Sequence, residues 1–409
     1  MITFHRAIKT LVVLALAGFC CLSGAQQGVA LLPTPVNSDA FSKSVKVVVP
    51  EDYKIYPNRK YITIYLLDSQ SDSFFECIRS SIKYLVDYGY MDPVILVGIS
   101  SMNRQYDFTP EPLTQTGKTE FKKSGGAELY YRYISQTVVP AVEHKYRCEP
   151  FRIGIGHSLG GTFLIDCLLK HQELFNANIV ISPNLVFDGE QLLHSAKDGR
   201  LAEAATNRFL YLANGHGDKT EEKFRATTMK FAELSKAQKS AGFHFLYDPL
   251  NNTSHGTTAL EGIPKGLVSL YSNIIYPDAQ YMKRISGDQE ALLGDVSKFY
   301  QAGSKWTGLK LPLIPDINLM GYNCHYLGHD DTAIRIFRRG ISVYPDDFNL
   351  YDSLGEIEQL SGNIAAARQY YTRGLEIVET QKAALDTETY ASLLAGFRSR
   401  LQSLVKKSP

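Results

Sequence analysis

The chain has 409 residues, of which 44% are hydrophobic and 21% are charged. This length suggests two or three domains with a sizeable buried core, and the hydrophobic content excludes a disordered chain. The 43 basic residues balance 42 acidic ones, so no overall charge attracts the protein to nucleic acid or to an anionic membrane. Six cysteines are too few for a small disulfide-stapled scaffold. A globular α/β protein is therefore expected.

Residues 1–25 have the order of a cleaved secretory signal. Arg6 and Lys9 form a basic end, Leu11–Phe19 is continuously apolar, and the small residues Ser23–Ala25 follow. The apolar run is shorter than the ~20 residues that span a bilayer. We expect cleavage after Ala25, export to the periplasm or the medium, and no stable membrane span in the mature protein. A membrane anchor and a disordered tag are the alternatives.

Strand-like and helix-like segments alternate from Ser44 to about Tyr271. Strands are predicted at Ser44–Val49, Tyr61–Leu67, Val94–Ile99, Arg152–Gly156, Ala177–Ser182, Arg208–Ala213 and Phe243–Tyr247. Amphipathic helices are predicted at Ser73–Tyr88, Glu128–Tyr146, Thr162–Lys170 and Glu221–Ser240. This alternation is typical of a doubly wound, mostly parallel sheet, with the first two strands as a candidate antiparallel pair at one edge. We assign this domain to residues 26–276.

Beyond Tyr276 the pattern predicts helices only, and residues recur with a period of 34. The residues Gly321, Gly328, Ala333, Phe337, Arg339 and Gly340 return as Gly355, Gly362, Ala367, Tyr371, Arg373 and Gly374. This spacing indicates tetratricopeptide-like repeats. We predict a helical linker at 277–315, then repeats at 316–409 that end in a cap helix at Thr387–Lys406. Two repeats rarely stand alone, so we expect them to pack on the linker, on the first domain or on a second copy.

The segment Gly156-His157-Ser158-Leu159-Gly160-Gly161 lies between a predicted strand and a predicted helix. A serine in a strained turn between these elements, with glycines two positions to either side, is a nucleophile elbow. The backbone N–H of Leu159 at the start of the helix would face a developing oxyanion. Gly154 and Gly156 also begin a dinucleotide-binding pattern, but Leu159 stands where its third glycine belongs, which excludes that interpretation.

A serine nucleophile needs a base and an acid that orients the base. His255 follows the last predicted strand and is the candidate base. The acid should follow the strand before it, where Asp218 lies in a glycine-rich loop and is the first choice. Glu221 and Asp248 are the alternatives. The order Ser158, Asp218, His255 is that of the α/β-hydrolases.

The second oxyanion donor should come from the loop after Tyr61–Leu67, which makes the backbone N–H groups of Ser69 and Gln70 the candidates. Arg104 and Tyr106, in the loop between Ser100 and Thr109, are the candidate substrate contacts. Arg104 would neutralise an anionic group of the substrate, and a surface salt bridge is an equal alternative.

Several motifs in this order resemble the putative esterase family, which is similar to enterobactin-type siderophore esterases and to esterase D. They are Tyr65-Leu66-Leu67-Asp68, Asn103-Arg104-Gln105-Tyr106-Asp107-Phe108-Thr109-Pro110, Ser124-Gly125-Gly126-Ala127, the elbow, Ile181-Ser182-Pro183 and Ser254-His255-Gly256. The resemblance implies an α/β-hydrolase fold and cofactor-free hydrolysis of carboxylic esters, and members with the Asp107–Pro110 loop often carry a helical extension. The chain departs from the family at Ser69, where glycine is usual, and at Asn184–Phe187, where many members have tryptophans.

We therefore expect a periplasmic or secreted serine esterase that acts on siderophore-type lactones or small acyl esters, without a cofactor or a metal. The alternative function is a non-catalytic adaptor on a hydrolase scaffold whose repeats hold a protein partner. A complete Ser158, His255 and acid set favours the enzyme, because an adaptor needs none of the three.

Overall fold

The computed structural model describes residues 30–32, 44–240 and 242–405. The predicted signal lies outside these residues, as does Lys406 at the end of the predicted cap helix. No helix in the described ranges is both long enough and apolar enough to cross a membrane. All four cysteines within these ranges, Cys77, Cys148, Cys167 and Cys324, carry free thiols.

Within the described residues, eight strands form one sheet in the order β1-β2-β4-β3-β5-β6-β7-β8. Their bounds are β1 Ala30–Leu32, β2 Val45–Val48, β3 Tyr61–Leu67, β4 Val94–Ile99, β5 Cys148–His157, β6 Ala177–Ile181, β7 Arg208–Gly215 and β8 Phe243–Leu250. From β4 to β8 every neighbouring pair is parallel, which confirms the doubly wound α/β fold. The expected pairing of the first two predicted strands was wrong: β2 pairs antiparallel with β4, because β3 lies between two parallel neighbours, β4 and β5.

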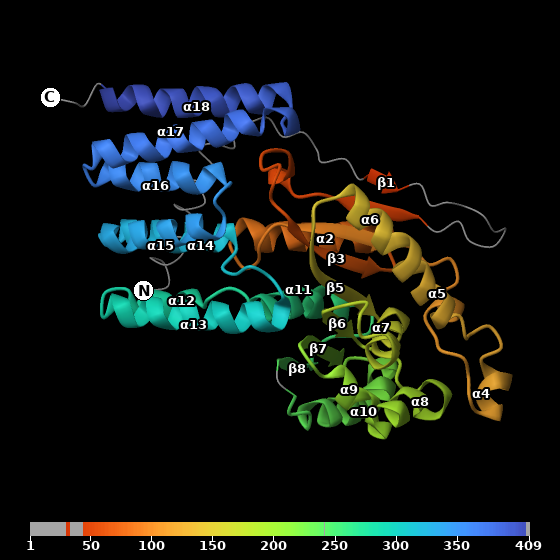
Figure 1. Ribbon diagram of the computed structural model, residues 1–409. Helices are drawn as coiled ribbons and strands as arrows, with labels where there is room; N and C mark the ends of the chain where they lie inside the picture. Colours follow the sequence, from red (N-terminus) through yellow and green to blue (C-terminus); the bar gives the residue numbers. More distant parts are fainter. Residues whose placement is uncertain (1–29, 33–43, 241, 406–409) are drawn as a thin grey trace.

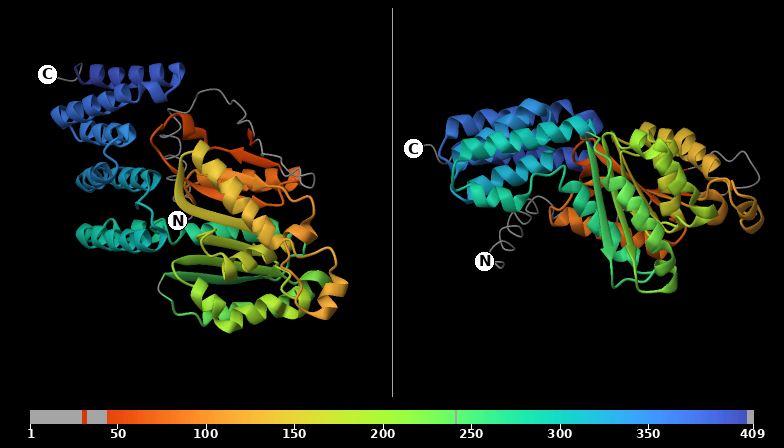
Figure 2. Two further views of the ribbon diagram at one scale, coloured as in Figure 1. Left: turned by 45° about the vertical axis from the view of Figure 1, so that its right-hand side comes forward. Right: turned by 90° about the horizontal axis from the view of Figure 1, so that it is seen from below.

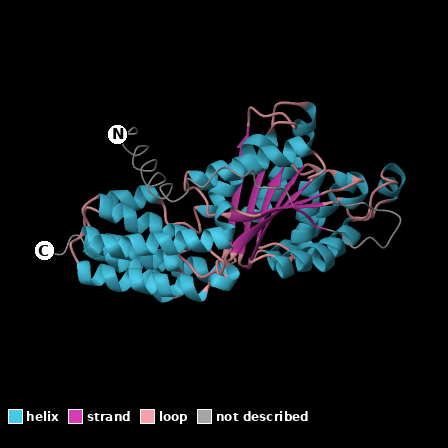
Figure 3. Ribbon diagram, turned by 90° about the horizontal axis from the view of Figure 1, so that it is seen from above, coloured by secondary structure: helices cyan, strands magenta, loops and turns pink. Residues whose placement is uncertain are grey.

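Helices cover both faces of the sheet (Figure 3). One face packs on α2 Asp72–Asp87 and α11 Thr258–Tyr271. The other face packs on α5 Ala127–Tyr133, α6 Val139–Lys145, α7 Leu159–Lys170 and α10 Lys219–Lys236. Shorter helices, α3 Arg104–Asp107, α4 Gln115–Glu120, α8 Phe187–Ser195 and α9 Leu201–Ala204, lie in the crossover segments. The helix predicted at Glu128–Tyr146 is α5 and α6 joined by a π-helical segment, Ile134–Val138.

The residues after Tyr276 form a stack of helices beside the sheet (Figures 1 and 2). The stack contains α12 Asp278–Arg284, α13 Gln289–Thr307, α14 Ile314–Tyr326, α15 Asp330–Val343, α16 Phe348–Leu360, α17 Ile364–Thr380 and α18 Thr387–Val405. The helix pairs α14–α15 and α16–α17 repeat one contact at a spacing of 34 residues. A Cβ on Gly321 would overlap the Phe337 ring, and a Cβ on Gly355 would overlap the Tyr371 ring. The recurring glycines therefore allow the close approach of paired helices.

The helical stack packs against the amino ends of the sheet strands. Trp306 of α13 contacts Phe151, near the start of β5, edge to face with ring centroids 5.6 Å apart. It also lies 4.6 Å from the ring of His244 on β8. One buried apolar cluster runs from Ile62 and Ile64 of β3 to Phe337 and Leu354 of the stack. The sheet and the helices therefore share a core.

Candidate active site

Ser158 lies at the carboxyl end of the central strand β5, in the turn that begins α7. Its φ of 58° and ψ of −122° place a non-glycine residue in a strained conformation, which is the geometry of a nucleophile elbow. The turn is tight because a Cβ on Gly156 would lie 2.5 Å from the carbonyl oxygen of Gly160. The sequence predicts this turn correctly because its steric demands are local.

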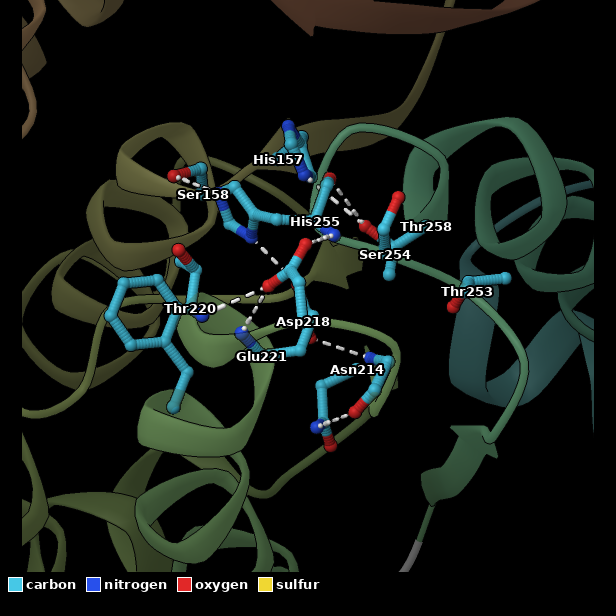
Figure 4. Close-up of polar contacts among 12 residues, drawn as sticks. His157, Ser158, Asn214, Asp218, Thr220, Glu221, Thr253, Ser254, His255 and Thr258 are labelled. Carbon is cyan, nitrogen blue, oxygen red and sulfur yellow. Dashed lines mark hydrogen bonds and ion pairs between the residues drawn. The ribbon is translucent and has the colours of Figure 1, made fainter.

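His255 comes from the loop between β8 and α11 and faces the serine (Figure 4). Its Nε2 lies 2.9 Å from Ser158 Oγ, within hydrogen-bond reach of a base and the proton it removes. The His255 ring packs against that of Phe224 of α10 in a T-shaped arrangement, with centroids 5.5 Å apart. The structure thus brings together the two side chains that the sequence predicted.

The carboxylate on the other ring nitrogen belongs to Glu221, the second choice, and not to Asp218, the first choice. Glu221 Oε1 lies 2.6 Å from His255 Nδ1. The Asp218 carboxylate instead caps α10 and accepts a hydrogen bond from the backbone N–H of His255. Asp248, the third choice, accepts a hydrogen bond from the Tyr211 hydroxyl and does not contact His255.

Glu221 is fully buried, and both of its oxygens have partners. Oε2 accepts a hydrogen bond of 2.6 Å from the backbone N–H of Gly215, at the end of β7. Burial alone would raise the pKa of this carboxyl, but hydrogen bonds, including those from His255 and Gly215, hold the pKa below its ordinary value. Glu221 is therefore ionised at neutral pH and able to stabilise an imidazolium.

The oxyanion side of the site is built from the N-terminus of α7 and the end of β3. Leu159 is the first residue of α7, so its N–H has no acceptor within the helix. The backbone N–H of Ser69, one of the two expected donors, donates to the carbonyl of Ile99 on β4 at 3.3 Å, which disfavours it as an oxyanion donor. The Gln70 side chain bridges Asp68 and the backbone N–H of Ser101, and its own N–H stays the candidate second donor.

The Arg104 guanidinium forms a bidentate ion pair with the Asp68 carboxylate. Nε lies 2.5 Å from Oδ1 and Nη2 lies 3.0 Å from Oδ2. Asp68 is buried with a φ of 66°, and a Cβ on Gly160 would lie 3.3 Å from its Oδ2. This ion pair therefore lies beside the N-terminus of α7. The Tyr106 ring packs over the backbone of Gly126, which leaves its expected substrate contact a prediction.

Asp188 is a structural residue of this edge that sequence reasoning missed. It follows β6, has a φ of 47° and is buried. Its carboxylate accepts hydrogen bonds from the backbone N–H groups of Leu113 and Thr114. The ring of Phe187 beside it contacts that of Phe121 in a tilted arrangement, with centroids 4.7 Å apart. These contacts join α8 to the segment around α4. Because the two segments are 75 residues apart in the sequence, no local pattern reveals the contacts.

His157, next to Ser158, packs beside the candidate base. Its Nε2 lies 3.2 Å from Thr258 Oγ1, and its ring lies 4.7 Å from that of His255. Burial and the neighbouring His255 lower the pKa of His157 to about 4. The described residues contain no group of three or more histidine, cysteine, aspartate or glutamate side chains arranged to hold a metal ion.

A family model described as "Putative esterase" matches residues 40–256, which is more than half of the chain. The chain belongs to the putative esterase family. The match contains Ser158, Glu221 and His255, and it ends before the helical stack. The predicted repeats therefore have no support from a family model.

One curated relative of this esterase is the ferri-bacillibactin esterase BesA of Bacillus subtilis (strain 168). It is 32% identical over 145 residues, which are 32% of this chain and 50% of the relative. The match thus spans half the length of that protein.

Two solved structures share the fold. An IroE-like serine hydrolase from Shewanella oneidensis superposes with a TM-score of 0.62 at 20% identity, over 76% of this chain and 98% of the other. An uncharacterised protein from Capnocytophaga ochracea DSM 7271 superposes with a TM-score of 0.56 at 15% identity, over 93% and 99%. Because the second match covers 93% of this chain, the other protein shares the helical region as well as the sheet domain.

Proposed function

We propose that this esterase hydrolyses carboxylic esters through a Ser158–His255–Glu221 triad and an acyl-enzyme intermediate. The Ser158 hydroxyl attacks the ester carbonyl while His255 Nε2 takes its proton. The N–H of Leu159, with a donor from the Asp68–Gln70 loop, stabilises the oxyanion. The protonated His255 then gives its proton to the departing alcohol. Water attacks the acyl-serine with His255 as the base, which releases the acid and restores Ser158.

The observation that carries this proposal is the unbroken chain of contacts from nucleophile to acid. Ser158 Oγ, His255 Nε2, His255 Nδ1 and Glu221 Oε1 are joined by distances of 2.9 and 2.6 Å. Three separate elements supply these residues, the β5–α7 turn, the β8–α11 loop and α10. A binding scaffold has no need of this arrangement, which is why we favour the enzyme over the adaptor.

For the substrate we propose siderophore-type lactones or small acyl esters. The support is membership of the esterase family, together with a relative that is named a ferri-bacillibactin esterase. Arg104 is already neutralised by Asp68, so it supplies little free positive charge for an anionic substrate.

The cellular location and the role of the repeats are further parts of this proposal. The sequence of residues 1–25 supports export to the periplasm or the medium. The 34-residue recurrence of glycine contacts supports a tetratricopeptide-like character for α14–α17. The helical stack packs at the amino ends of the strands through Trp306 of α13, and Ser158 lies at a carboxyl end. A protein partner on the repeats would therefore bind away from the serine.

The test is labelling of the purified protein with a fluorophosphonate probe, which reacts with activated serines. We expect the wild-type protein and Ser297→Ala, a serine change in α13, to label, and Ser158→Ala to remain unlabelled. Ester hydrolysis should follow the same pattern. Labelling that persists in Ser158→Ala would exclude Ser158 as the nucleophile. An unlabelled wild-type protein would refute an activated serine and favour the adaptor.

A further inference from the structure

The Asp218 carboxylate accepts hydrogen bonds from the backbone of both Glu221 and His255, although it does not touch the imidazole. Its Oδ1 accepts hydrogen bonds of 2.9 Å from the backbone N–H groups of Thr220 and Glu221. Its Oδ2 accepts a hydrogen bond of 2.6 Å from the backbone N–H of His255. Figure 4 shows this carboxylate between the start of α10 and the loop that carries His255.

This position is important because Glu221 and His255 lie on separate elements. Glu221 lies in the first turn of α10, after β7, and His255 follows β8. The two loops are also joined where the N–H groups of His216 and Gly217 donate to the carbonyl of Thr253. Those hydrogen bonds join the two loops through residues that precede Glu221 and His255 in the chain. Asp218 contacts the backbone of the two functional residues themselves.

We propose that Asp218 is a positioning residue that sets the distance between the Glu221 carboxylate and the His255 ring. The inference rests on the proposed function. Both ends of the bridge need an acceptor, since every partner is a backbone N–H. Aspartate supplies two acceptor oxygens on one short side chain, whereas asparagine supplies one acceptor and an NH₂ group that cannot accept.

The charge of Asp218 agrees with this role. The backbone N–H groups of Glu221 and His255 lower the pKa of the Asp218 carboxyl below its ordinary value, so it is ionised at neutral pH and accepts hydrogen bonds at both oxygens. Its place at the N-terminus of α10 is also favourable for a negative charge.

The experiment compares Asp218→Asn with Asp218→Ser, because both keep a side-chain oxygen for the helix cap and remove the acceptor that faces His255. Asp288→Asn is the matched control, because Asp288 caps α13 through the N–H of Ala291 far from the triad in the sequence. We expect the rate of fluorophosphonate labelling to fall about tenfold to a hundredfold in both Asp218 variants. Asp288→Asn should label at the wild-type rate, and all three proteins should unfold within a few degrees of the wild type.

A proton NMR signal separates positioning from a purely structural effect. The proton between His255 Nδ1 and Glu221 should resonate far downfield, and its loss in Glu221→Gln assigns it. In Asp218→Asn we expect this signal to persist but to shift and broaden, because the acid and the ring are no longer held at one distance.

Two results would overturn the inference. In the first, both Asp218 variants label at the wild-type rate with an unchanged signal. In the second, Asp218→Asn loses the signal and Glu221→Gln retains it, which would make Asp218 the acid. A wild-type protein that does not label refutes the proposed function instead, so the two failures are distinguishable.

Discussion

Arg59 and Asp347 are 288 residues apart in the sequence, yet their side chains form an ion pair of 3.4 Å in which each is at most 10% exposed. The Arg59 guanidinium also lies 3.7 Å from the centre of the Tyr56 ring, and Tyr56 stacks on Phe348 of α16 at 5.3 Å. These residues connect the loop before β3 to the helical stack. The stack is therefore part of the folded esterase and shares its core.

Trp306→Ala should destabilise the whole protein. Trp306 is 7% exposed and packs between the rings of Phe151 and His244, so its removal leaves a cavity between the sheet and the stack. We expect a loss of about 3–5 kcal/mol in the free energy of unfolding, measured by urea denaturation. Tyr84→Ala, at a side chain that is 56% exposed, should change it by less than about 0.5 kcal/mol. A wild-type midpoint for Trp306→Ala would show that the two regions are not energetically coupled.

Glu221→Gln should abolish most of the esterase activity. The change keeps the size of the side chain, but an amide cannot stabilise the imidazolium as a carboxylate does. We expect kcat on a chromogenic ester to fall by about 10³–10⁴-fold, by analogy with triad carboxylates. Asp248→Asn is the control and should stay within about twofold of the wild type, because Asp248 bonds Tyr211 and not His255. If instead Asp248→Asn lost more activity than Glu221→Gln, Asp248 would be the residue that orients His255.

Arg104→Gln should slow catalysis because it leaves the negative charge of Asp68 without its ion-pair partner. The Asp68 carboxylate would lose its ion-pair partner beside the N-terminus of α7, where the oxyanion develops, and would keep only the neutral hydrogen bond from Gln70. We expect kcat to fall about tenfold, and the second change Asp68→Asn to restore part of the loss because it removes the uncompensated charge. A double-mutant cycle on kcat measures this coupling. Additive effects of the two changes would show that Arg104 acts independently of Asp68, for example on the substrate.

The lowered pKa of His157 should make the free energy of unfolding fall in mild acid. Its pKa is lowered to about 4 in the folded protein, against about 6.5 for an unfolded histidine. Between these values the unfolded chain binds the extra proton, so stability is full above about pH 6.5 and is lost progressively as the pH falls toward 4. The loss is at most about 3 kcal/mol. His157→Gln cannot take up this proton, so its thermal midpoint should depend less on pH over this range. Parallel pH profiles for the two proteins would refute the assignment to His157.

The candidate nucleophile and the candidate base could be proposed from the sequence because their signals are local. A glycine-flanked serine between a strand and a helix has one sterically acceptable turn, and Ser158 occupies it. His255 follows from chain order, since the carboxyl ends of parallel strands meet at one edge of the sheet. The strands β3 and β4 lie at their predicted bounds because fully buried strands are continuous apolar runs.

The identity of the acid depended on where α10 begins. Asp218 and Glu221 are three residues apart, and the helix starts between them, at Lys219. Asp218 therefore uses its carboxylate on free N–H groups at the helix end, and Glu221 faces the imidazole from the first turn. The Asp218-x-x-Glu221 spacing resembles a helix-capping pattern, and that was the signal available in the sequence.

The sequence by itself determined the fold class and pointed to the candidate nucleophile and the candidate base, because each depends on short-range sterics or on the order of elements in a parallel sheet. Only the tertiary structure showed which carboxylate contacts the His255 ring, the occupied N–H of Ser69 and the packing of the helices on the amino ends of the strands. These features depend on contacts between side chains and backbone groups that are far apart in the chain, such as Arg59 with Asp347. Their geometry is set by the three-dimensional packing of several elements, which no single segment encodes.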